Sequence, residues 1–184
     1  MAVLEPLKLT ITNYEGSEEM DFEINQTDPE AGTRKVRFSG NLYIEKSDFS
    51  LNPPPKYFRG KLGGYVRLKN AYIVRCDDVV TDESGEVMEV KCTYLPESRS
   101  GHDTSGVKAK GVIHWVDAES CADVTVKQYE HLLKDAEYAG QDFSERMNHD
   151  SEHILHGKAE PYLLEAEEGQ AFQLMRTGYY KKCT

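Results

Sequence analysis

The sequence is poor in positive charge and lacks the long apolar runs of a membrane protein. Its 184 residues contain 22 Lys and Arg against 32 Asp and Glu, so the formal net charge is −10. Because phosphate is repelled by a surface of that sign, the chain does not coat nucleic acid indiscriminately. No apolar run approaches the ~18 residues of a transmembrane helix. No basic segment followed by an apolar one marks a secretory signal, so we expect no contact with a membrane.

Cysteine and histidine are few and are not spaced as metal ligands or redox pairs. The four cysteines are Cys76, Cys92, Cys121 and Cys183. They form no CxxC, so neither a zinc ribbon nor a thioredoxin-like site is predicted, and free thiols in a reducing cytoplasm are the natural interpretation. His149, His153 and His156 would lie on one face only if the segment were helical. The residues around them are typical of a loop. The sequence thus predicts no metal site.

Sequence signatures of catalysis are also missing. There is no GxSxG, no GxxxxGK[ST], and no GxGxxG after a strand pattern. Ser100, His102 and Asp103 are neighbours in sequence, whereas the members of a catalytic triad meet in space rather than by adjacency. A hydrolase built on these three residues stays only as an alternative. We expect the chain to have no catalytic residue and no bound cofactor of its own.

The dominant hydrophobic period is two, which is the period of a β-strand. Apolar Leu7, Leu9 and Ile11 alternate with polar residues, and a polar turn at residues 82–86 separates two apolar runs as in a β-hairpin. Similar patterns predict strands at residues 36–38, 41–44, 65–69, 71–76, 87–94, 107–116, 124–129 and 171–183. Helical signals are limited to one turn at residues 47–51 and a short helix at 130–138. The polar segments 15–30, 97–106 and 140–161 are interpreted as loops.

The number and length of these strands indicate the fold class. Many short strands joined by turns, without any long amphipathic segment, are typical of an all-β fold of closed or nearly closed antiparallel barrels with little helix. A single barrel rarely needs 184 residues, so we expect two barrels.

One window of the chain runs against the overall charge. Residues 52–76 carry no Asp or Glu. Their basic side chains are Lys56, Arg59, Lys61, Arg67, Lys69 and Arg75, and the aromatic rings among them are Tyr57, Phe58, Tyr65 and Tyr72. Cations with interleaved rings are suited to gripping phosphates and stacking bases. Residues 15–30 carry seven acids and no base, so a nucleic acid would bind one face in a defined orientation.

The strand pattern inside this window groups its cations. It places Tyr65, Arg67 and Lys69 on one face and the apolar residues between them toward a core. An unpaired base could stack on the ring while the cations bond its edge or its phosphate; the alternative is an ordinary solvated strand face. Residues 53–55 are all proline, which favours extended polyproline II geometry and would present residues 56–61 rigidly to a ligand.

Five blocks of sequence stand out together by their order and spacing. They are MAVLEPLKL (1–9), YVRLKNAY (65–72), CTY (92–94), KGVIHWV (110–116) and AFQ (171–173), the last followed by Arg176, Gly178 and Tyr179. Together they resemble the C-terminal anticodon-binding region of glutaminyl-tRNA synthetases, over nearly the whole chain. The resemblance implies two β-barrels. A proximal barrel would comprise residues 1–12 plus 117–184, with its last strand missing, and a distal barrel would comprise residues 13–116.

The resemblance also implies which residues bind RNA, with the anticodon loop of glutamine tRNA as the partner. These residues are Lys56, Arg59, Arg67, Lys69, Gln173 and Arg176. The position matching Arg59 would hold the third anticodon base, and those matching Arg67 and Lys69 the first. The position matching Gln173 would bond the middle base, with Arg176 close by. Lys69 stands where the family has arginine, so bidentate bonding is lost there, and Lys56 and Phe58 stand where the family has glutamine and lysine.

The resemblance further implies a longer parent protein, a glutamine–tRNA ligase of class I. A catalytic domain holding ATP and Mg²⁺ would precede Met1, and a final strand would follow Thr184. The chain would contact that catalytic domain, belong to a cytoplasmic monomer and be inactive alone. Two alternatives stay open. One is the barrel-type anticodon-binding domain of glutamyl-tRNA synthetases. The other is a structural RNA-binding barrel such as the 5S-rRNA-binding ribosomal protein, for which a basic overall charge would be expected.

Overall fold

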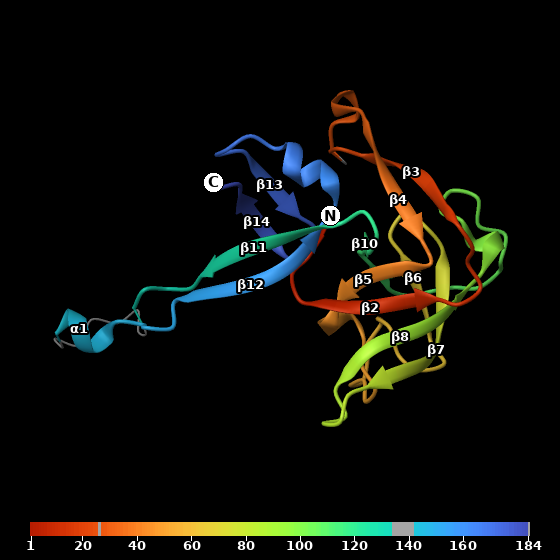
Figure 1. The fold of residues 1–184 in the computed structure, drawn as a ribbon, viewed down its shortest axis with the longest axis horizontal. Coiled ribbons are helices and arrows are strands. Elements are labelled where there is room, and N and C mark those ends of the chain that lie inside the picture. Colours follow the sequence, from red (N-terminus) through yellow and green to blue (C-terminus); the bar gives the residue numbers. More distant parts are fainter. Residues whose placement is uncertain (26, 134–141, 184) are drawn as a thin grey trace.

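The computed structural model describes residues 1–25, 27–133 and 142–183, and these form strands with very little helix (Figure 1). The strands are β1 (Ala2–Val3), β2 (Pro6–Ile11), β3 (Ser17–Glu23), β4 (Thr33–Ser39), β5 (Asn41–Glu45), β6 (Tyr65–Leu68), β7 (Ile73–Thr81), β8 (Val87–Tyr94), β9 (Val112–Ile113), β10 (Val116–Asp117), β11 (Ala122–Tyr129), β12 (Glu152–Ala159), β13 (Ala171–Leu174) and β14 (Gly178–Lys181). Within the described residues, helix is limited to α1 (Phe143–Arg146) and to 3₁₀ turns at Pro29–Ala31, Lys46–Asp48, Pro96–Ser98 and Pro161–Glu165. The all-β prediction is confirmed. No helix in the described ranges could span a membrane.

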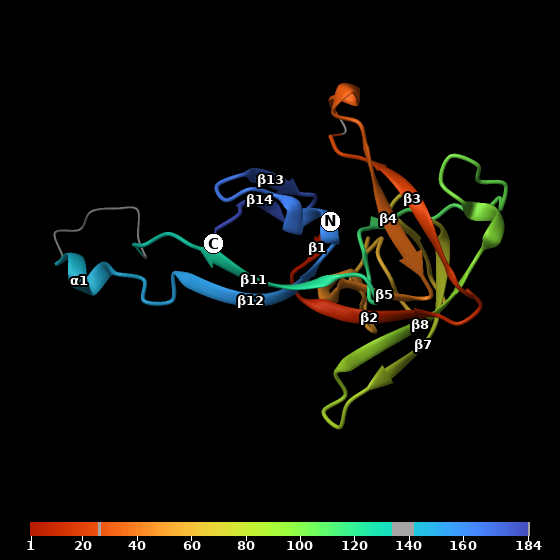
Figure 2. The same ribbon diagram turned by 45° about the horizontal axis from the view of Figure 1, so that its top comes forward.

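A seven-stranded sheet forms the larger part of the molecule and curls back on itself (Figure 2). Its order is β10-β5-β2-β8-β7-β6-β9. The two edge strands, β9 and β10, are separated in sequence only by His114 and Trp115. Three peptide steps span at most ~11 Å, so the opposite edges of the sheet are held next to one another. The β2–β8 and β6–β9 pairs are parallel, a detail that the expectation of antiparallel barrels did not include.

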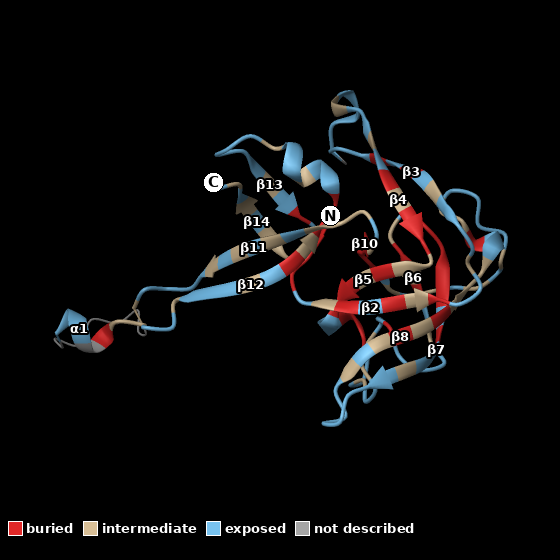
Figure 3. Ribbon diagram, viewed as in Figure 1, coloured by how far each residue is buried: buried red, intermediate tan, exposed pale blue. Residues whose placement is uncertain are grey.

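Aromatic side chains fill the core of the curled sheet. Trp115 is fully buried and lies edge-on to Phe38 and Phe22, with ring centroids 5.0 and 6.0 Å apart. Its indole nitrogen donates a hydrogen bond to the carbonyl of Lys69 at 3.0 Å. The expected alternation of β2 is confirmed, because Leu7, Leu9 and Ile11 are all buried, and buried residues concentrate in this part of the molecule (Figure 3).

The acidic segment of residues 15–30 is not simply a loop, which corrects our interpretation. Residues 17–23 form β3, which pairs antiparallel with β4 along its whole length. Met20 and Phe22 point into the core of the large sheet and are each 2% exposed, while Glu19, Asp21 and Glu23 are exposed on the other face. In the sequence of this acidic segment, the spacing of Met20 and Phe22 two positions apart was the only indication of a strand.

A second, smaller core lies beside the first. Strands β1, β12 and β11 form a three-stranded sheet, and β13 pairs with β14. The side chains buried there are Ala2, Leu4, Ala159 and Leu174. Strand β2 pairs with β5 and β8 in the large sheet, although we grouped residues 1–12 with the proximal barrel. The division of the chain into two barrels stays a prediction.

The loop expected at residues 140–161 is wrong for its second half. β12 pairs with β11 from Glu152 to Ala159, and the two strands form a ribbon that projects from the molecule (Figures 1 and 2). His153 and His156 therefore lie on a strand and not on one face of a helix. The strand expected at 107–116 is reduced to the short pieces β9 and β10. The helix expected at 130–138 lies mostly outside the described residues, and the described 130–133 are not helical.

Glu18 on β3 ties the β3–β4 ribbon to the loop that follows β8. Its carboxylate accepts hydrogen bonds from the hydroxyls of Tyr14 at 2.9 Å and Tyr72 at 2.8 Å, and it pairs with Arg99. Burial raises the pKa of Glu18, but the bonds from Arg99 and the two tyrosines outweigh burial and hold this pKa below its ordinary value of 4.5.

Acid should weaken this junction. Because the folded-state pKa of Glu18 lies below its unfolded value, its stabilisation is fully present above the unfolded value and is lost as pH falls through the folded pKa. We expect the wild type to be more stable than Glu18→Gln at neutral pH, and the two unfolding free energies to converge below about pH 4.5. Urea unfolding of both proteins across this range is the measurement. A gap that does not change with pH would contradict the prediction.

Candidate nucleic-acid interface

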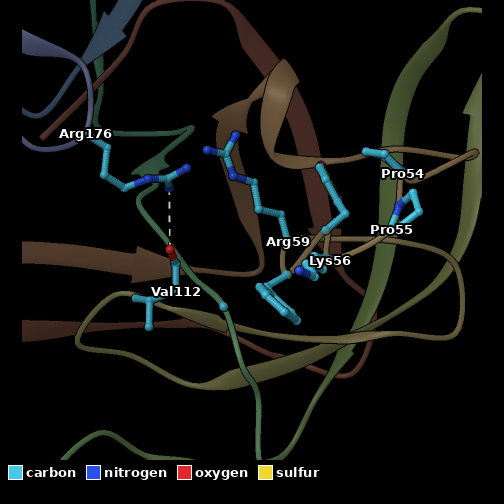
Figure 4. Close-up of a pocket in the computed structure, with 9 residues that line it drawn as sticks. Pro54, Pro55, Lys56, Arg59, Val112 and Arg176 are labelled. Atoms are coloured by element: carbon cyan, nitrogen blue, oxygen red, sulfur yellow. Dashed lines mark hydrogen bonds between the residues drawn. The ribbon is translucent and has the colours of Figure 1, made fainter.

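A shallow hollow of about 440 Å³ lies where the proline segment meets β9 and the β13–β14 turn. Its lining residues are Pro54, Pro55, Lys56, Tyr57, Phe58, Arg59, Gly111, Val112 and Arg176. Three of the predicted RNA-binding residues, Lys56, Arg59 and Arg176, therefore line one hollow although they are up to 120 residues apart in sequence. Figure 4 shows Arg59 and Arg176 pointing toward one another, with Lys56 and the prolines to one side.

Both arginines contact one buried carboxylate, that of Asp48. Arg176 makes a bidentate contact, with Nη1–Oδ2 at 2.9 Å and Nη2–Oδ1 at 2.5 Å. Arg59 Nη1 lies 3.2 Å from Oδ1 and also donates to the carbonyl of Ser47 at 3.1 Å. The Asp48 side chain is 0% exposed, whereas those of Arg59 and Arg176 are 42% and 28% exposed. The arrangement keeps a net positive charge and leaves part of each guanidinium facing the hollow.

The segment at residues 53–58 that leads to the hollow begins with three prolines and carries an exposed aromatic ring. After the three prolines, Lys56 has a left-handed backbone with φ of 66°, and the hydroxyl of Tyr57 donates to the carbonyl of Ser47 at 3.0 Å. Phe58 is 50% exposed, with the ammonium of Lys110 above its ring at 5.5 Å. A cation beside a solvent-facing ring is a surface on which an unpaired base can stack.

Gly111 lines the hollow at a point of very close backbone approach. A Cβ atom at this position would lie 1.5 Å from the carbonyl oxygen of Phe58, so only glycine fits. The carbonyl of Gly111 also accepts a hydrogen bond from the backbone N–H of Arg67 at 3.0 Å. The chain at residues 110–112 thus connects the segment that carries Arg59 to strand β6.

Arg67 does not reach the same hollow by any contact in the described residues. The predicted alternation of β6 is confirmed, since Val66 and Leu68 are fully buried. The guanidinium of Arg67 donates to the carbonyl of Ser98 at 2.8 Å and to the hydroxyl of Ser100 at 3.3 Å, and it pairs with Asp103. Ser100 and Asp103, two of the three residues of the hydrolase alternative, are therefore partners of Arg67.

Lys69 lies at the junction between the two cores. Its ammonium contacts the sulfur of Met175, next to Arg176, at 2.7 Å. Burial lowers the pKa of Lys69, and the positive charge of Arg34 lowers it further, while Glu160 and Glu23 oppose the shift. The first-base residues expected from the resemblance, Arg67 and Lys69, are thus both held by protein contacts.

Gln173 lies on β13, three residues before Arg176. Its side chain is exposed, and its partner across the hairpin is Tyr179, which is 83% exposed. The hairpin therefore presents an amide, which offers both a hydrogen-bond donor and an acceptor, beside a solvent-facing ring. This combination can read the edge of a base and stack on its face.

Sequence reasoning missed two residues of this site, Asp48 and Gly111. Asp48 lies just before the basic window in the sequence, and nothing in its local sequence indicates that it pairs with Arg59 and Arg176. Gly111 was noticed as part of the KGVIHWV block, but its contact with Phe58 is a tertiary one. All four cysteines are free thiols. In the described residues, no three His, Cys, Asp or Glu side chains gather as metal ligands.

Comparison with known protein families identifies the class of protein to which this fold and interface belong. Residues 1–95 and residues 112–182 match two models that share the description "tRNA synthetases class I (E and Q), anti-codon binding domain". The chain therefore belongs to the anticodon-binding domain family of the class I tRNA synthetases for E and Q.

Its relatives among individual proteins are named glutamine–tRNA ligases. The chain is 51% identical to the protein of that name from Rhodopirellula baltica, 49% identical to that of Clostridium perfringens and 42% identical to that of Nitrobacter hamburgensis. Each similarity covers 98% of this chain but only 31%, 33% and 33% of the respective ligase. The chain thus spans about a third of the length of the relatives it matches.

Proposed function

We propose that this chain recognises the anticodon of glutamine tRNA and so directs a glutamine–tRNA ligase to its correct substrate. The observation that carries the proposal is the pair Arg59 and Arg176, held on Asp48 at the rim of a hollow beside Lys56 and an exposed Phe58 ring. Planar guanidinium forks bond base edges and phosphates, and rings stack unpaired bases. The identity of about 50% to glutamine–tRNA ligases over nearly the whole chain supports the choice of glutamine.

The proposal assigns separate bases to separate groups. Arg59, beside Lys56, serves the third anticodon base, and Arg67 with Lys69 serves the first. Gln173 bonds the middle base with Arg176 close by, because an amide matches the donor and acceptor of a uracil edge. The distribution of these residues over the hollow, strand β6 with the residue after it, and the β13–β14 hairpin suits three bases that are splayed apart rather than stacked together.

Other parts of the proposal concern the whole protein. ATP-dependent glutaminylation would take place in a separate catalytic domain that this chain contacts, in a cytoplasmic monomer. ATP and Mg²⁺ would be bound by that catalytic domain, as the family resemblance implies.

Filter binding with tRNA transcripts tests the proposal. The chain should bind glutamine tRNA more tightly than the same tRNA with a changed anticodon, and the affinity should fall as salt rises because cations are released from the phosphates. Glutamate tRNA is the second tRNA to compare, since the family includes synthetases for both E and Q. Equal affinity for the original and changed anticodons would overturn the proposal, and tighter binding of glutamate tRNA would move it to a glutamyl-tRNA synthetase.

Removing Arg59 should weaken binding selectively. We expect Arg59→Ala to lose affinity for glutamine tRNA by about 10- to 100-fold, the range for a lost hydrogen bond to a charged group. Gln173→Ala should lose about 5-fold, with most of the loss confined to tRNA that carries the correct middle base. Arg37→Ala is the matched control, because Arg37 has the same charge but pairs with Asp117 and Glu119 away from the hollow. A loss of similar size in the control would contradict the assignment.

A further inference from the structure

We infer that Asp48 is a positioning residue of the interface, whose buried carboxylate fixes Arg59 and Arg176 in the orientations in which they bind unpaired nucleotides. This inference rests on the proposed function, namely that the hollow binds tRNA. Asp48 itself faces no solvent, since its side chain is 0% exposed. It therefore makes no contact of its own with the RNA, and any effect that depends on contact passes through the two arginines that it holds.

The first argument is the cost of burying Asp48. A buried carboxylate is strongly unfavourable unless its charge and its lone pairs are satisfied. Both oxygens of Asp48 are satisfied by guanidinium groups, at 2.5 and 2.9 Å from Arg176 and at 3.2 Å from Arg59. The carboxylate therefore holds both arginines. Rotation of Arg176 would leave Asp48 with its single contact to Arg59, and rotation of Arg59 would leave Oδ1 with Arg176 alone, so either movement weakens the pairing of a buried charge.

The second argument is that Asp48 links two distant parts of the chain. Arg59 follows the proline segment, whereas Arg176 lies in the turn between β13 and β14 with a left-handed φ of 71°. The backbone carbonyl of Asp48 also accepts the N–H of Gly60 at 2.8 Å. The 3₁₀ turn Lys46–Asp48 thus holds the main chain next to Arg59 and the side chain of Arg176 at once. The hollow exists only because both segments are brought to this turn.

The third argument is the sign of the charge. A negative group beneath a site for a polyanion opposes binding by simple electrostatics. Its presence there is explained if the gain from orienting two guanidinium forks exceeds the repulsion, because a fork binds a base edge or phosphate well only in a fixed plane. The positioning role and the simple charge effect therefore predict opposite results for the same substitution.

The test is Asp48→Asn, which keeps the size of the side chain and removes its charge. If Asp48 acts through the arginines, affinity for glutamine tRNA should fall by about tenfold or more, and the preference for the correct anticodon should fall with it. If Asp48 only repels phosphate, affinity should rise instead. Tighter binding, or unchanged binding with unchanged preference, would overturn the inference.

Asp117→Asn is the matched control for this test. Asp117 is also a buried aspartate paired with an arginine, Arg37 Nη1 at 3.3 Å, but neither residue lines the hollow. We expect it to change stability without changing the ratio of affinities for the two anticodons. A loss of preference as large as that of Asp48→Asn would show that any buried aspartate has this effect and would count against a specific role.

A double-mutant cycle keeps the inference testable if Asp48→Asn fails to fold. Because Arg59 and Arg176 share one carboxylate, each single alanine variant should already disturb the other arginine. The loss of affinity in Arg59→Ala/Arg176→Ala should therefore be smaller than the product of the two single losses. Losses that multiply would mean that the arginines act independently and would overturn the inference. Equal binding of both tRNAs by the wild type would instead count against the proposed function itself.

Discussion

Gly111→Ala should lower the stability of the protein by about 3 kcal/mol or more and should also weaken its binding to glutamine tRNA. The added methyl group would lie 1.5 Å from the carbonyl oxygen of Phe58, and a backbone atom cannot swing away as the end of a flexible side chain can. Either β9 or the segment that carries Phe58 and Arg59 has to move. Urea unfolding gives the loss of stability, and filter binding gives the effect on the interface.

Gly40→Ala is the control for this prediction. A Cβ atom there would lie 3.1 Å from the carbonyl oxygen of Tyr14, so a shift of a few tenths of an ångström accommodates it, and we expect a loss of about 1 kcal/mol or less. Gly111→Ala with the unfolding midpoint of the wild type would show that the two segments do not approach as closely as the structure indicates. Normal stability with weakened tRNA binding would locate the shift in the segment that carries Arg59.

Trp115→Ala should cost about 3–5 kcal/mol of stability, the range for removing a large aromatic side chain from a core. Trp115 is 0% exposed, lies against Phe22 and Phe38, and bonds the carbonyl of Lys69. It also lies between the two edge strands of the large sheet. Because Trp115 is the only tryptophan in the chain, unfolding of this variant has to be followed by circular dichroism rather than by tryptophan fluorescence.

Trp115→Phe separates packing from hydrogen bonding at this position. It keeps an aromatic ring but loses the indole N–H, so we expect an intermediate loss of about 1–2 kcal/mol. Equal losses for the alanine and phenylalanine variants would mean that the bond to Lys69, and not the packing against Phe22 and Phe38, dominates the contribution of Trp115.

The strands that could be predicted from sequence are those with one apolar face. β2, β5 and β6 alternate apolar and polar residues because one side of each faces the large core. β12 was missed because its burial comes from small residues at one end. Gly157 is buried since the backbone of Val3 crosses it, at 2.6 Å from a possible Cβ, and glycine has no apolar side chain to show this. Residues 107–116, which bring the two edges of the large sheet together, were predicted as one strand because nothing local divides them into β9 and β10.

The interface was predictable only in part. The excess of cations in residues 52–76 follows from charge alone, and the resemblance added Gln173 and Arg176. The role of Asp48 depends on a contact between residues 48 and 176, which no local pattern encodes. The same is true of Arg67, whose partners lie in the loop after β8. Composition therefore locates the charged segments, whereas the pairing of individual cations is a property of the tertiary structure.

The late position in the sequence of the two edge strands, β9 and β10, has a consequence for the synthesis of the protein. Five of the seven strands of the large sheet, β2 and β5 to β8, are complete by residue 94, whereas both edge strands lie at residues 112–117. At ~5–20 residues per second, the nascent chain waits for on the order of seconds with the edges of β5 and β6 unpaired. Unpaired strand edges can pair with other chains, so the edges of β5 and β6 are open to such pairing during this interval of translation.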